Sequence, residues 1–389
     1  MTSQYRPRQR VGRSARELPD NLPEALQRRR AEGDAASRSP LIGVTTGGTP
    51  TPGLFTLTDT GLSLDDVRAA AQALRDSLTL AQRQTIGFPL DAPEWRQWSN
   101  VHPFLMRHGL LLDTMADSSR ELALDILRAT LSPAGFETAR NVMRLNETIR
   151  EITGSDAEYG EWLYWLSLFG DLAEERPDEP WGWQIDGHHL IVNCLVVGGQ
   201  LVATPTFMGT EPVTADAGKY HGTTVFHDEE SQAYALMTSL SAPQRAKAII
   251  GDELPTEVFT TAFRDNFELT YEGIRYDEFP SKEQATLVAL IETYVNRSRA
   301  DHAALKMAEV KAHLGETYFA WMGGVGDDLP FYYRVHSPVL LIEFDHQRGV
   351  ALDHDQASRA HIHTIVRTPN GNDYGADLLR QHHALGHAH

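Results

Sequence analysis

The first half of the chain places apolar residues at the spacing of amphipathic helices. Within residues 63–84, apolar positions recur at intervals of three and four residues, so they line one side of a helix. These positions are Val67, Ala70, Ala71, Leu74 and Leu78. The pattern predicts a helix that buries this stripe against a core.

Later segments begin with residues that favour helix starts. Ser132 followed by Pro133 is typical of an N-cap residue and a first helical residue. In a capping box, a Ser or Thr is followed three residues later by Glu or Gln, and the two satisfy each other's backbone N–H groups. Two pairs have this spacing, Ser118 with Glu121 and Ser281 with Gln284. We expect helices after all three signals.

Beyond residue 180 the pattern changes to that of strands. The apolar runs 188–197 and 200–207 are separated by Gly198 and Gly199, a pair typical of a tight hairpin. Helical spacing returns at about 228–250, 282–299 and 301–314. Four further strand-like runs and a short helix then follow, at 317–324, 331–337, 338–345, 361–367 and 375–385.

These elements predict an α+β fold, with a helical N-terminal half packed on a mostly antiparallel sheet built from the later strands. We expect an irregular arginine-rich tail over residues 1–40 and a single domain over 41–389. The helical part covers about 62–175, and the sheet-bearing part covers about 181–389.

The net charge of -18 argues against a general binder of nucleic acid or of anionic membranes. No apolar run reaches the length of about 20 residues that a spanning helix needs. The first 20 residues hold no apolar stretch of a secretory signal, and the single cysteine, Cys194, excludes an internal disulfide. We therefore expect a cytoplasmic protein that acts on a small molecule. The arginines of the tail fit a solvated segment better than a basic binding arm.

Histidines are distributed very unevenly. The chain has 17, but only His102 and His108 precede residue 180, and nine lie in residues 336–389. Histidine is the commonest metal ligand, and it titrates near neutral pH. The second half of the chain is therefore where we expect the chemistry.

The motif "HIHTIVR" is the clearest candidate for a metal site. Side chains alternate along a strand, so His361 and His363 point to the same face with Cα atoms about 6.6 Å apart. Two imidazoles so placed can converge on one ion. The alternative is a solvated or buried pair of histidines without a metal.

Two acidic residues lie on the neighbouring predicted strand, in "VLLIEFDH". Glu343 and Asp345 share one face, opposite Leu340 and Ile342. Burying carboxylates in an apolar strand is costly unless they have partners. They could be metal ligands, a catalytic base, or acceptors that orient ligand imidazoles, or they could face solvent on a half-exposed sheet.

Adjacent histidines stand in "WGWQIDGHHL". On a regular strand, His188 and His189 point to opposite faces, so only one should reach a given site unless Gly187 distorts the backbone. We expect one to be a ligand and the other to be packed or hydrogen-bonded, and both are candidates.

The segment "RTPNGNDYGADLLRQHH" could form a substrate pocket at the start of a helix. Arg367 and Arg380 could bind a carboxylate or phosphate there, and Asn372 could orient it. The alternative is simple helix capping. The aromatic candidates for the pocket are Trp183, Tyr333 and Tyr374.

Several segments together resemble one known family. They are "PWGWQIDGHHLIVN", "TPTFMGTEP", "YEGI", "FYYRVHSPVLLIEFDHQ" and "HIHTIVRTPNGNDYGADLLRQHH". In this order they are similar to the signature of domain of unknown function family 3500, from about residue 60 to the end. The resemblance implies that the histidine-bearing segments belong to one recurrent domain, and it carries no activity, substrate or cofactor.

The resulting hypothesis is a metal-dependent enzyme. A divalent iron, copper or zinc ion would be bound by His361, His363 and one of His188 and His189, with Glu343 or Asp345 as ligand or base. The sequence has no P-loop, nucleophile elbow, H-E-x-x-H or C-x-x-C motif, which favours an oxidoreductase. The alternatives are a zinc-type hydrolase with Glu343 as base, a non-catalytic metal- or ligand-binding protein, and a metal-free polar network of histidines.

Overall fold

A computed structural model describes residues 3–8, 14, 22–100, 107–172 and 179–386. The described residues form ten α-helices and a sheet of 13 strands, and most strand pairs are antiparallel. The predicted α+β class is confirmed. No described helix has both the length and the apolar character needed to cross a membrane.

The helices agree closely with the apolar periodicity. Ser132 caps α5 as predicted, because its side chain accepts a hydrogen bond from the Gly135 N–H. The two predicted capping boxes are wrong: Ala116 precedes α4 and Pro280 precedes α8, without a side-chain cap at either. The helices are α1 Glu24–Arg38, α2 Asp65–Ser77, α3 Leu80–Ile86, α4 Asp117–Thr130, α5 Pro133–Thr153, α6 His227–Ser239, α7 Ala242–Ala248, α8 Ser281–Val295, α9 Ala300–Ala312 and α10 Ala376–Gly386.

Helix α1 corrects the prediction of an irregular tail over residues 1–40. Its sequence, rich in arginine and alanine, has good helix propensity but little apolar periodicity, so the pattern gave no signal. The helix is held by tertiary contacts: the Arg96 guanidinium donates hydrogen bonds to the carbonyls of Ser37 and Ser39 at its C-terminal end.

A single sheet joins the two halves of the chain, in the order β1-β3-β4-β5-β7-β13-β12-β11-β10-β8. The short strands β2, β6 and β9 pair with β3, β5 and β10. The predicted hairpin at Gly198 and Gly199 is confirmed as the β5–β6 turn. The strands are β1 Gly87–Phe88, β2 Leu110–Leu111, β3 Tyr164–Gly170, β4 Trp181–Gly187, β5 Leu190–Val197, β6 Gln200–Val202, β7 Thr206–Thr210, β8 Ile249–Gly251, β9 Ile274–Arg275, β10 Tyr318–Gly323, β11 Phe331–His336, β12 Leu341–Arg348 and β13 Ala357–Arg367.

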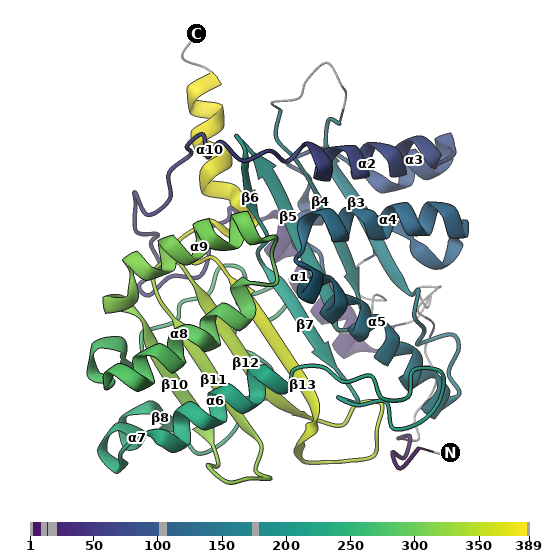
Figure 1. Ribbon diagram of the computed structural model, residues 1–389. Coiled ribbons are helices and arrows are strands. Elements are labelled where there is room, and N and C mark those ends of the chain that lie inside the picture. Colours follow the sequence, from purple (N-terminus) through teal and green to yellow (C-terminus); the bar gives the residue numbers. More distant parts are fainter. Residues whose placement is uncertain (1–2, 9–13, 15–21, 101–106, 173–178, 387–389) are drawn as a thin grey trace.

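The two faces of the sheet are covered differently. Figure 1 shows α2, α4, α5, α6, α8 and α9 across the near face, while α1 lies behind the sheet. On the helix-covered face, Met208, Ile342 and Ile362 belong to the larger apolar core. On the loop-covered face, Phe207 and Ile365 pack in a separate core against residues of loops and short helices.

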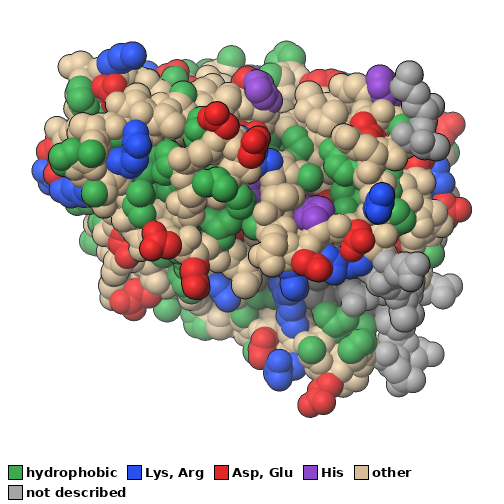
Figure 2. Space-filling model, turned by 90° about the horizontal axis from the view of Figure 1, so that it is seen from below, with side chains coloured by type: hydrophobic (Ala, Val, Ile, Leu, Met, Phe, Trp, Pro, Cys, Tyr) green, Lys and Arg blue, Asp and Glu red, His purple; other side chains and the backbone are tan. Residues whose placement is uncertain are grey.

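Strand alternation puts the odd-numbered residues of β13 on the loop-covered face. His361 and His363 therefore share that face with Ile365, and Asp345 joins them because it pairs with His363 across β12 and β13. The outer surface of the molecule seen in Figure 2 has basic and acidic side chains interspersed.

Candidate metal centre

Three imidazoles meet on the loop-covered face of the sheet. The Nε2 atom of His363 lies 3.1 Å from that of His189 and 3.0 Å from that of His361, and the third separation, between His189 and His361, is 3.2 Å. All three residues are at least nine-tenths buried. We call His189, His361 and His363 the histidine triad.

The triad is assembled from segments far apart in the sequence. His361 and His363 come from β13, and His189 comes from the two-residue turn between β4 and β5. His189 has a φ of 65°, in the left-handed region that non-glycine residues rarely adopt. Such conformations cost about 1–3 kcal/mol and are found mostly where the surrounding structure requires a particular side-chain direction.

Gly209 on β7 makes room for two of the rings. A Cβ atom at this position would lie 2.9 Å from Cδ2 of His363 and 3.2 Å from Cδ2 of His189. The Gly209 N–H also donates a 2.8 Å hydrogen bond to the carbonyl of His189, which holds the turn against β7. The absence of a side chain at Gly209 therefore leaves the space that both imidazole rings occupy.

Hydrogen bonds at Nδ1 fix the tautomers of two triad members. Nδ1 of His361 lies 2.7 Å from the carbonyl of Arg348, and Nδ1 of His363 lies 2.7 Å from Oε1 of Glu257. Because both partners are acceptors, both Nδ1 atoms carry the proton and leave Nε2 with a lone pair. Burial further lowers the pKa of His361 to about 4, so its neutral form is favoured.

The spacing of the Nε2 atoms suits a single metal ion. With metal–nitrogen bonds of about 2.0–2.1 Å, nitrogens at right angles lie about 2.8–3.0 Å apart, and nitrogens of a tetrahedron about 3.3–3.4 Å apart. The observed 3.0, 3.1 and 3.2 Å fall between these values. The three residues therefore fit one ion as three neighbouring ligands, and the other coordination positions of the ion would stay open.

His188 does not join the triad. As expected, one of the adjacent histidines joins the group and the other is hydrogen-bonded elsewhere, but strand alternation is not the reason, because both lie in the turn and their rings stack at 3.9 Å between centroids. His188 Nδ1 instead lies 2.9 Å from Oδ1 of Asn146 on α5. In this turn, His189 therefore contacts the other two imidazoles of the triad, whereas His188 contacts Asn146.

Two carboxyl groups lie beside His363, of which the sequence analysis identified only one. Glu257 and Asp345 each offer an oxygen within 4.8 Å of the other and of a His363 nitrogen. Burial raises the pKa of Glu257, but the facing His363 and several hydrogen bonds outweigh it and hold the pKa below its ordinary value. Burial and the nearby charges of Glu257 and Glu343 raise the pKa of Asp345 well above its ordinary value. The pair therefore favours one charge, on Glu257.

Glu211 is a second carboxylate that the sequence analysis missed. It is fully buried, and its oxygens accept hydrogen bonds from the backbone N–H groups of Val350, Ala351 and Leu352 in the β12–β13 loop. One oxygen lies 3.7 Å from Nδ1 of His361. Glu211 therefore fixes the loop that supports His361 and puts negative charge behind that ligand.

Glu343 is not one of the groups that surround the triad, and its carboxylate is held by other hydrogen bonds. Its oxygens accept the N–H groups of Phe259 and Thr260 and the hydroxyls of Thr260 and Tyr332. With four donors, the carboxylate anchors the loop that carries Glu257. The structure does not bring Glu343 into the group around the triad, and its predicted role as base remains a prediction.

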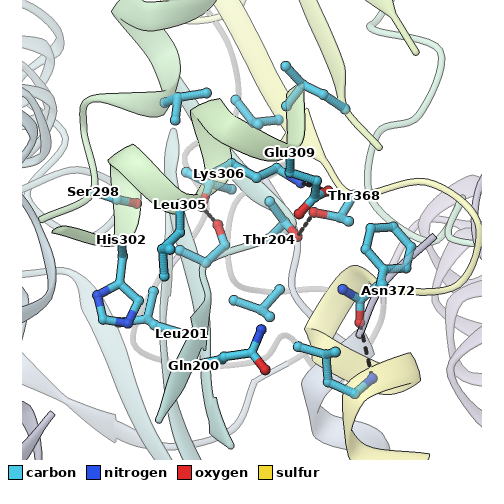
Figure 3. A pocket seen from close by; sticks show the side chains of 18 of the residues that line it. Gln200, Leu201, Thr204, Ser298, His302, Leu305, Lys306, Glu309, Thr368 and Asn372 are labelled. Carbon is cyan, nitrogen blue, oxygen red and sulfur yellow. Dashed lines mark hydrogen bonds and ion pairs between the residues drawn. The ribbon is translucent and has the colours of Figure 1, made fainter. Parts of the chain in front are cut away.

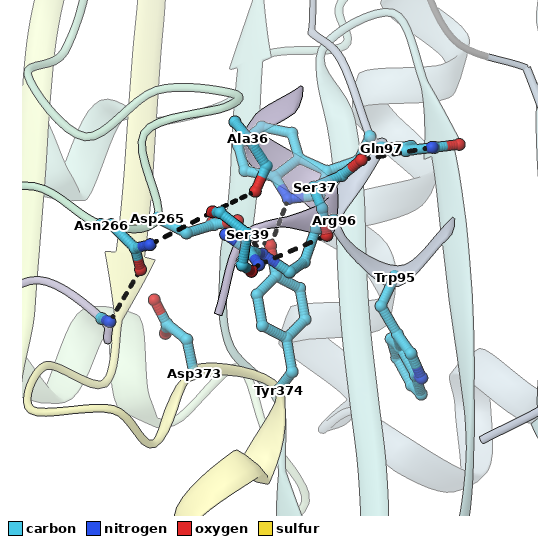
Figure 4. A network of polar contacts seen from close by, with 12 residues as sticks. Ala36, Ser37, Ser39, Trp95, Arg96, Gln97, Asp265, Asn266, Asp373 and Tyr374 are labelled. Atoms are coloured by element: carbon cyan, nitrogen blue, oxygen red, sulfur yellow. Dashed lines mark hydrogen bonds and ion pairs between the residues drawn. The ribbon is translucent and has the colours of Figure 1, made fainter. Parts of the chain in front are cut away.

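Arg367 and Tyr374, candidates for substrate binding, lie in a closed network. The fully buried Arg367 donates to Asp265 and Asp373, and the Tyr374 hydroxyl donates to Asp265 and accepts from Trp98. Figure 4 shows part of this network, where Arg96 links Asp265 to the end of α1. The charged groups are paired within the protein, so this network holds loops together beside the triad.

The other predicted substrate residues are dispersed. Trp183 is buried in the core of the helix-covered face, and the Tyr333 hydroxyl contacts that of Tyr294. Arg380 pairs with Asp377 near the surface, and Asn372 lines a cavity on the helix-covered face. The structure brings none of these four side chains to the triad.

The sequence could indicate some of these placements and not others. His361 and His363 follow from strand alternation alone. Glu257 lies in the irregular segment between β8 and β9, where no periodicity constrains its direction. Glu211 directly follows β7. Its place at the end of an apolar strand was the only feature of the sequence that could have indicated a role near the triad.

Comparison with known proteins gives a family and no activity. No curated protein and no solved structure matches the chain. The family model described as protein of unknown function (DUF3500) matches residues 60–376, a range that contains the whole histidine triad as well as Glu211 and Glu257. The match covers most of the chain, and the protein therefore belongs to the DUF3500 family.

Proposed function

We propose that the protein is a metal-dependent oxidoreductase whose histidine triad binds one divalent transition metal. The observation that carries the proposal is the convergence of three Nε2 atoms within 3.0–3.2 Å of one another. For His361 and His363 the Nδ1 protons are already committed to acceptors, so a proton cannot bridge these two Nε2 atoms in their neutral forms. A cation removes the repulsion between lone pairs that face each other.

The charge balance supports a divalent ion. Glu211 and Glu257 lie behind His361 and His363, and among the described residues their ion pairs within 4 Å are with histidines, while Arg29 also interacts with Glu257 electrostatically. Glu211 is fully buried and the Glu257 side chain is 20% exposed, so a divalent cation at the triad would lower the cost of holding both negative charges away from water. Carboxylates and carbonyls that accept from ligand imidazoles are also the usual supports of metal-bound histidines.

The arrangement favours redox chemistry over hydrolysis. With metal–nitrogen bonds of about 2.0–2.1 Å, the Nε2 separations correspond to angles at the metal of about 91–106°, between the right angles of an octahedron and the angle of a tetrahedron. Three ligands on one side of an ion leave open positions on the other, as in the facial triads of non-haem iron oxygenases. Here a third histidine takes the place of the carboxylate, and an iron or copper ion would supply the electron transfer.

A zinc-type hydrolase is the second candidate. A metal-bound water needs an acceptor for its proton, and the Glu257 carboxylate is the ionised group nearest to the triad. Its Oε1 atom lies at Nδ1 of His363, on the far side of the ring from Nε2, which favours a supporting role. This observation places hydrolysis second.

The test is reconstitution of tag-free, metal-stripped protein with iron(II), copper and zinc in turn. We expect one equivalent of iron or copper per chain and oxygen uptake that depends on a small organic co-substrate. His363→Ala should abolish both, whereas His383→Ala on α10 is the matched control and should change neither. Stoichiometric binding of zinc alone, with hydrolysis of ester or phosphoester substrates under nitrogen, would favour the second candidate. No stoichiometric metal would reject both.

A further inference from the structure

A cavity of about 370 Å³ lies on the helix-covered face of the sheet, on the side opposite to the triad. Cavities of about 300–1,000 Å³ are typical of small-molecule sites. The walls come from residues 54–60, β6, β7, α8, α9 and the start of α10. Most of the lining is apolar, and the apolar side chains include Leu54, Phe55, Leu201, Val202, Leu305 and Val366.

The charged side chains of the cavity favour an anion. The lining contains Arg297 and Lys306 but only one acidic residue, Glu309. The whole protein has a net charge of -18, so this balance is the reverse of the average surface. A cavity with apolar walls and a buried guanidinium suits an amphipathic anion.

Arg297 has unused capacity on the cavity side. Its Nη2 atom pairs with Glu229, which lies away from this cavity, and its Nη1 atom lies 3.8 Å from the sulfur of Met208. A thioether is a weak acceptor, whereas a guanidinium can donate a bidentate pair to a carboxylate. Arg297 is also nine-tenths buried, where a charged hydrogen bond is strengthened.

The other polar groups largely satisfy each other. Lys306 donates to Glu309 at 2.9 Å and to the carbonyl of Val339 at 2.8 Å, and the hydroxyls of Thr204 and Thr368 are 2.8 Å apart. Figure 3 shows the Lys306 and Glu309 side chains next to this threonine pair, with His302 on the other side of the view. Arg297 is therefore the cation of the lining with most to gain from an anionic ligand.

His302 gives an independent sign that the lining is incomplete. The residue lines the cavity and is 5% exposed, and its Nε2 atom has no hydrogen-bond partner among the described residues. Its Nδ1 atom is held by Asp301 at 3.0 Å. Buried polar atoms without partners are rare, and they mark places where a partner is absent from the structure.

We propose that this cavity binds a small amphipathic monocarboxylate, with its carboxylate on Nη1 of Arg297 and its apolar body along Leu201, Val202 and Leu305. The site is separate from the triad, because the strands β7 and β13 lie between the two. The inference is therefore independent of the proposed metal centre.

The test is isothermal titration calorimetry of the full-length protein with octanoate, octan-1-ol and acetate. We expect octanoate to bind with a stoichiometry of one, octan-1-ol to bind at least about tenfold more weakly, and acetate not to bind measurably. The tenfold difference is the minimum expected from a charged hydrogen bond of about 1.5–3 kcal/mol.

Three variants test whether the ligands bind in this cavity, and they are chosen so that a loss of binding can be distinguished from a failure to fold. Arg297→Gln combined with Glu229→Gln removes both partners of the buried pair, so no lone charge is left behind. This double variant should lose the preference for octanoate over octan-1-ol. Leu201→Trp should block both ligands by filling the cavity. Lys311→Gln, on α9 outside this cavity, is the matched control and should bind as the wild type does.

Three results would overturn the proposal: equal affinity for octanoate and octan-1-ol, no binding of either, or octanoate binding that survives Leu201→Trp in a variant whose thermal transition matches the wild type. The metal content of each variant should stay at the wild-type level, since the cavity and the triad lie on opposite faces.

Discussion

Two buried polar clusters lie on the same face of the sheet and differ in how complete they are. In the network around Arg367, the guanidinium meets Asp265 and Asp373, and the Tyr374 hydroxyl both donates and accepts. In the histidine triad, three Nε2 atoms lie within 3.0–3.2 Å of one another, and those of His361 and His363 are acceptors. The comparison shows that burial of polar groups alone does not identify a site. What distinguishes the triad is that three ring nitrogens of the same kind converge on one point, whereas the groups of the network meet groups of opposite charge.

The largest stability effect should come from breaking the closed network. Arg367→Met leaves the buried Asp265 and Asp373 without their shared cation, so the free energy of unfolding should fall by about 3–5 kcal/mol. Urea denaturation followed by tryptophan fluorescence measures this. The folded fraction should still bind one metal per chain. Loss of metal from well-folded protein would show that the two clusters are one site.

A smaller loss of stability is expected when a methyl group is added next to the triad at Gly209. Gly209→Ala places a methyl group 2.7 Å from the backbone carbonyl of Ile362 and close to the His363 and His189 rings, and overpacking of this kind costs about 1–3 kcal/mol. The backbone of β13 at Ile362 and the two rings must shift, so metal affinity should fall along with stability. Gly315→Ala is the control, because its Cβ atom would meet no atom within 4 Å. Unchanged metal affinity in a stable Gly209→Ala variant would contradict the assigned role of Gly209.

Removing charge behind a ligand should weaken the metal without unfolding the protein. Glu257→Gln keeps the shape and an acceptor for His363 Nδ1, but removes the negative charge. Loss of such a supporting carboxylate typically lowers metal affinity about 10–100-fold. Competition with a chelator of known affinity measures the change. Glu316→Gln, in the short 3₁₀ helix Leu314–Glu316 that follows α9, is a matched control, since Glu316 pairs with His313 and is not one of the groups around the triad.

The smallest effect should come from the histidine next to the triad. His188→Gln removes the ring that stacks on His189 and alters the contact with Asn146, which together should cost about 1 kcal/mol of unfolding free energy. Metal stoichiometry should remain one. A complete loss of metal in this variant, with a normal thermal transition, would mean that His188 and not only His189 is a ligand.

Local rules predicted much of the fold. Alternation in "HIHTIVR" placed His361 and His363 on one face, Ser132 and Pro133 marked the start of α5, and Gly198 and Gly199 marked a hairpin. Each of these depends on residues within a few positions of one another. Helix α1 was missed because tertiary hydrogen bonds, and not an apolar stripe, hold it in place.

The site was predicted less completely because it depends on long-range placement. Treating His188 and His189 as strand residues overlooked the turn, in which a left-handed conformation turns His189 toward β13. Glu257 and Glu211 reach the triad from a loop and from the end of β7, and no sequence spacing links them to residues 361–363. Glu343 had the right face but was already held by the backbone of residues 259–260. The sequence predicts the direction of side chains on one strand. It does not predict which hydrogen-bond donors of distant segments bind each carboxylate.

The central claim is that the three Nε2 atoms bind one metal ion, and X-ray absorption at the metal edge tests it most directly. Protein reconstituted with one equivalent of iron(II) or copper should give a spectrum fitted by three imidazole ligands with metal–nitrogen distances of about 2.0–2.1 Å. The fitted number of imidazoles should fall to two in His189→Ala. A first shell made mainly of oxygen, with an imidazole count that does not change in His189→Ala, would contradict the account.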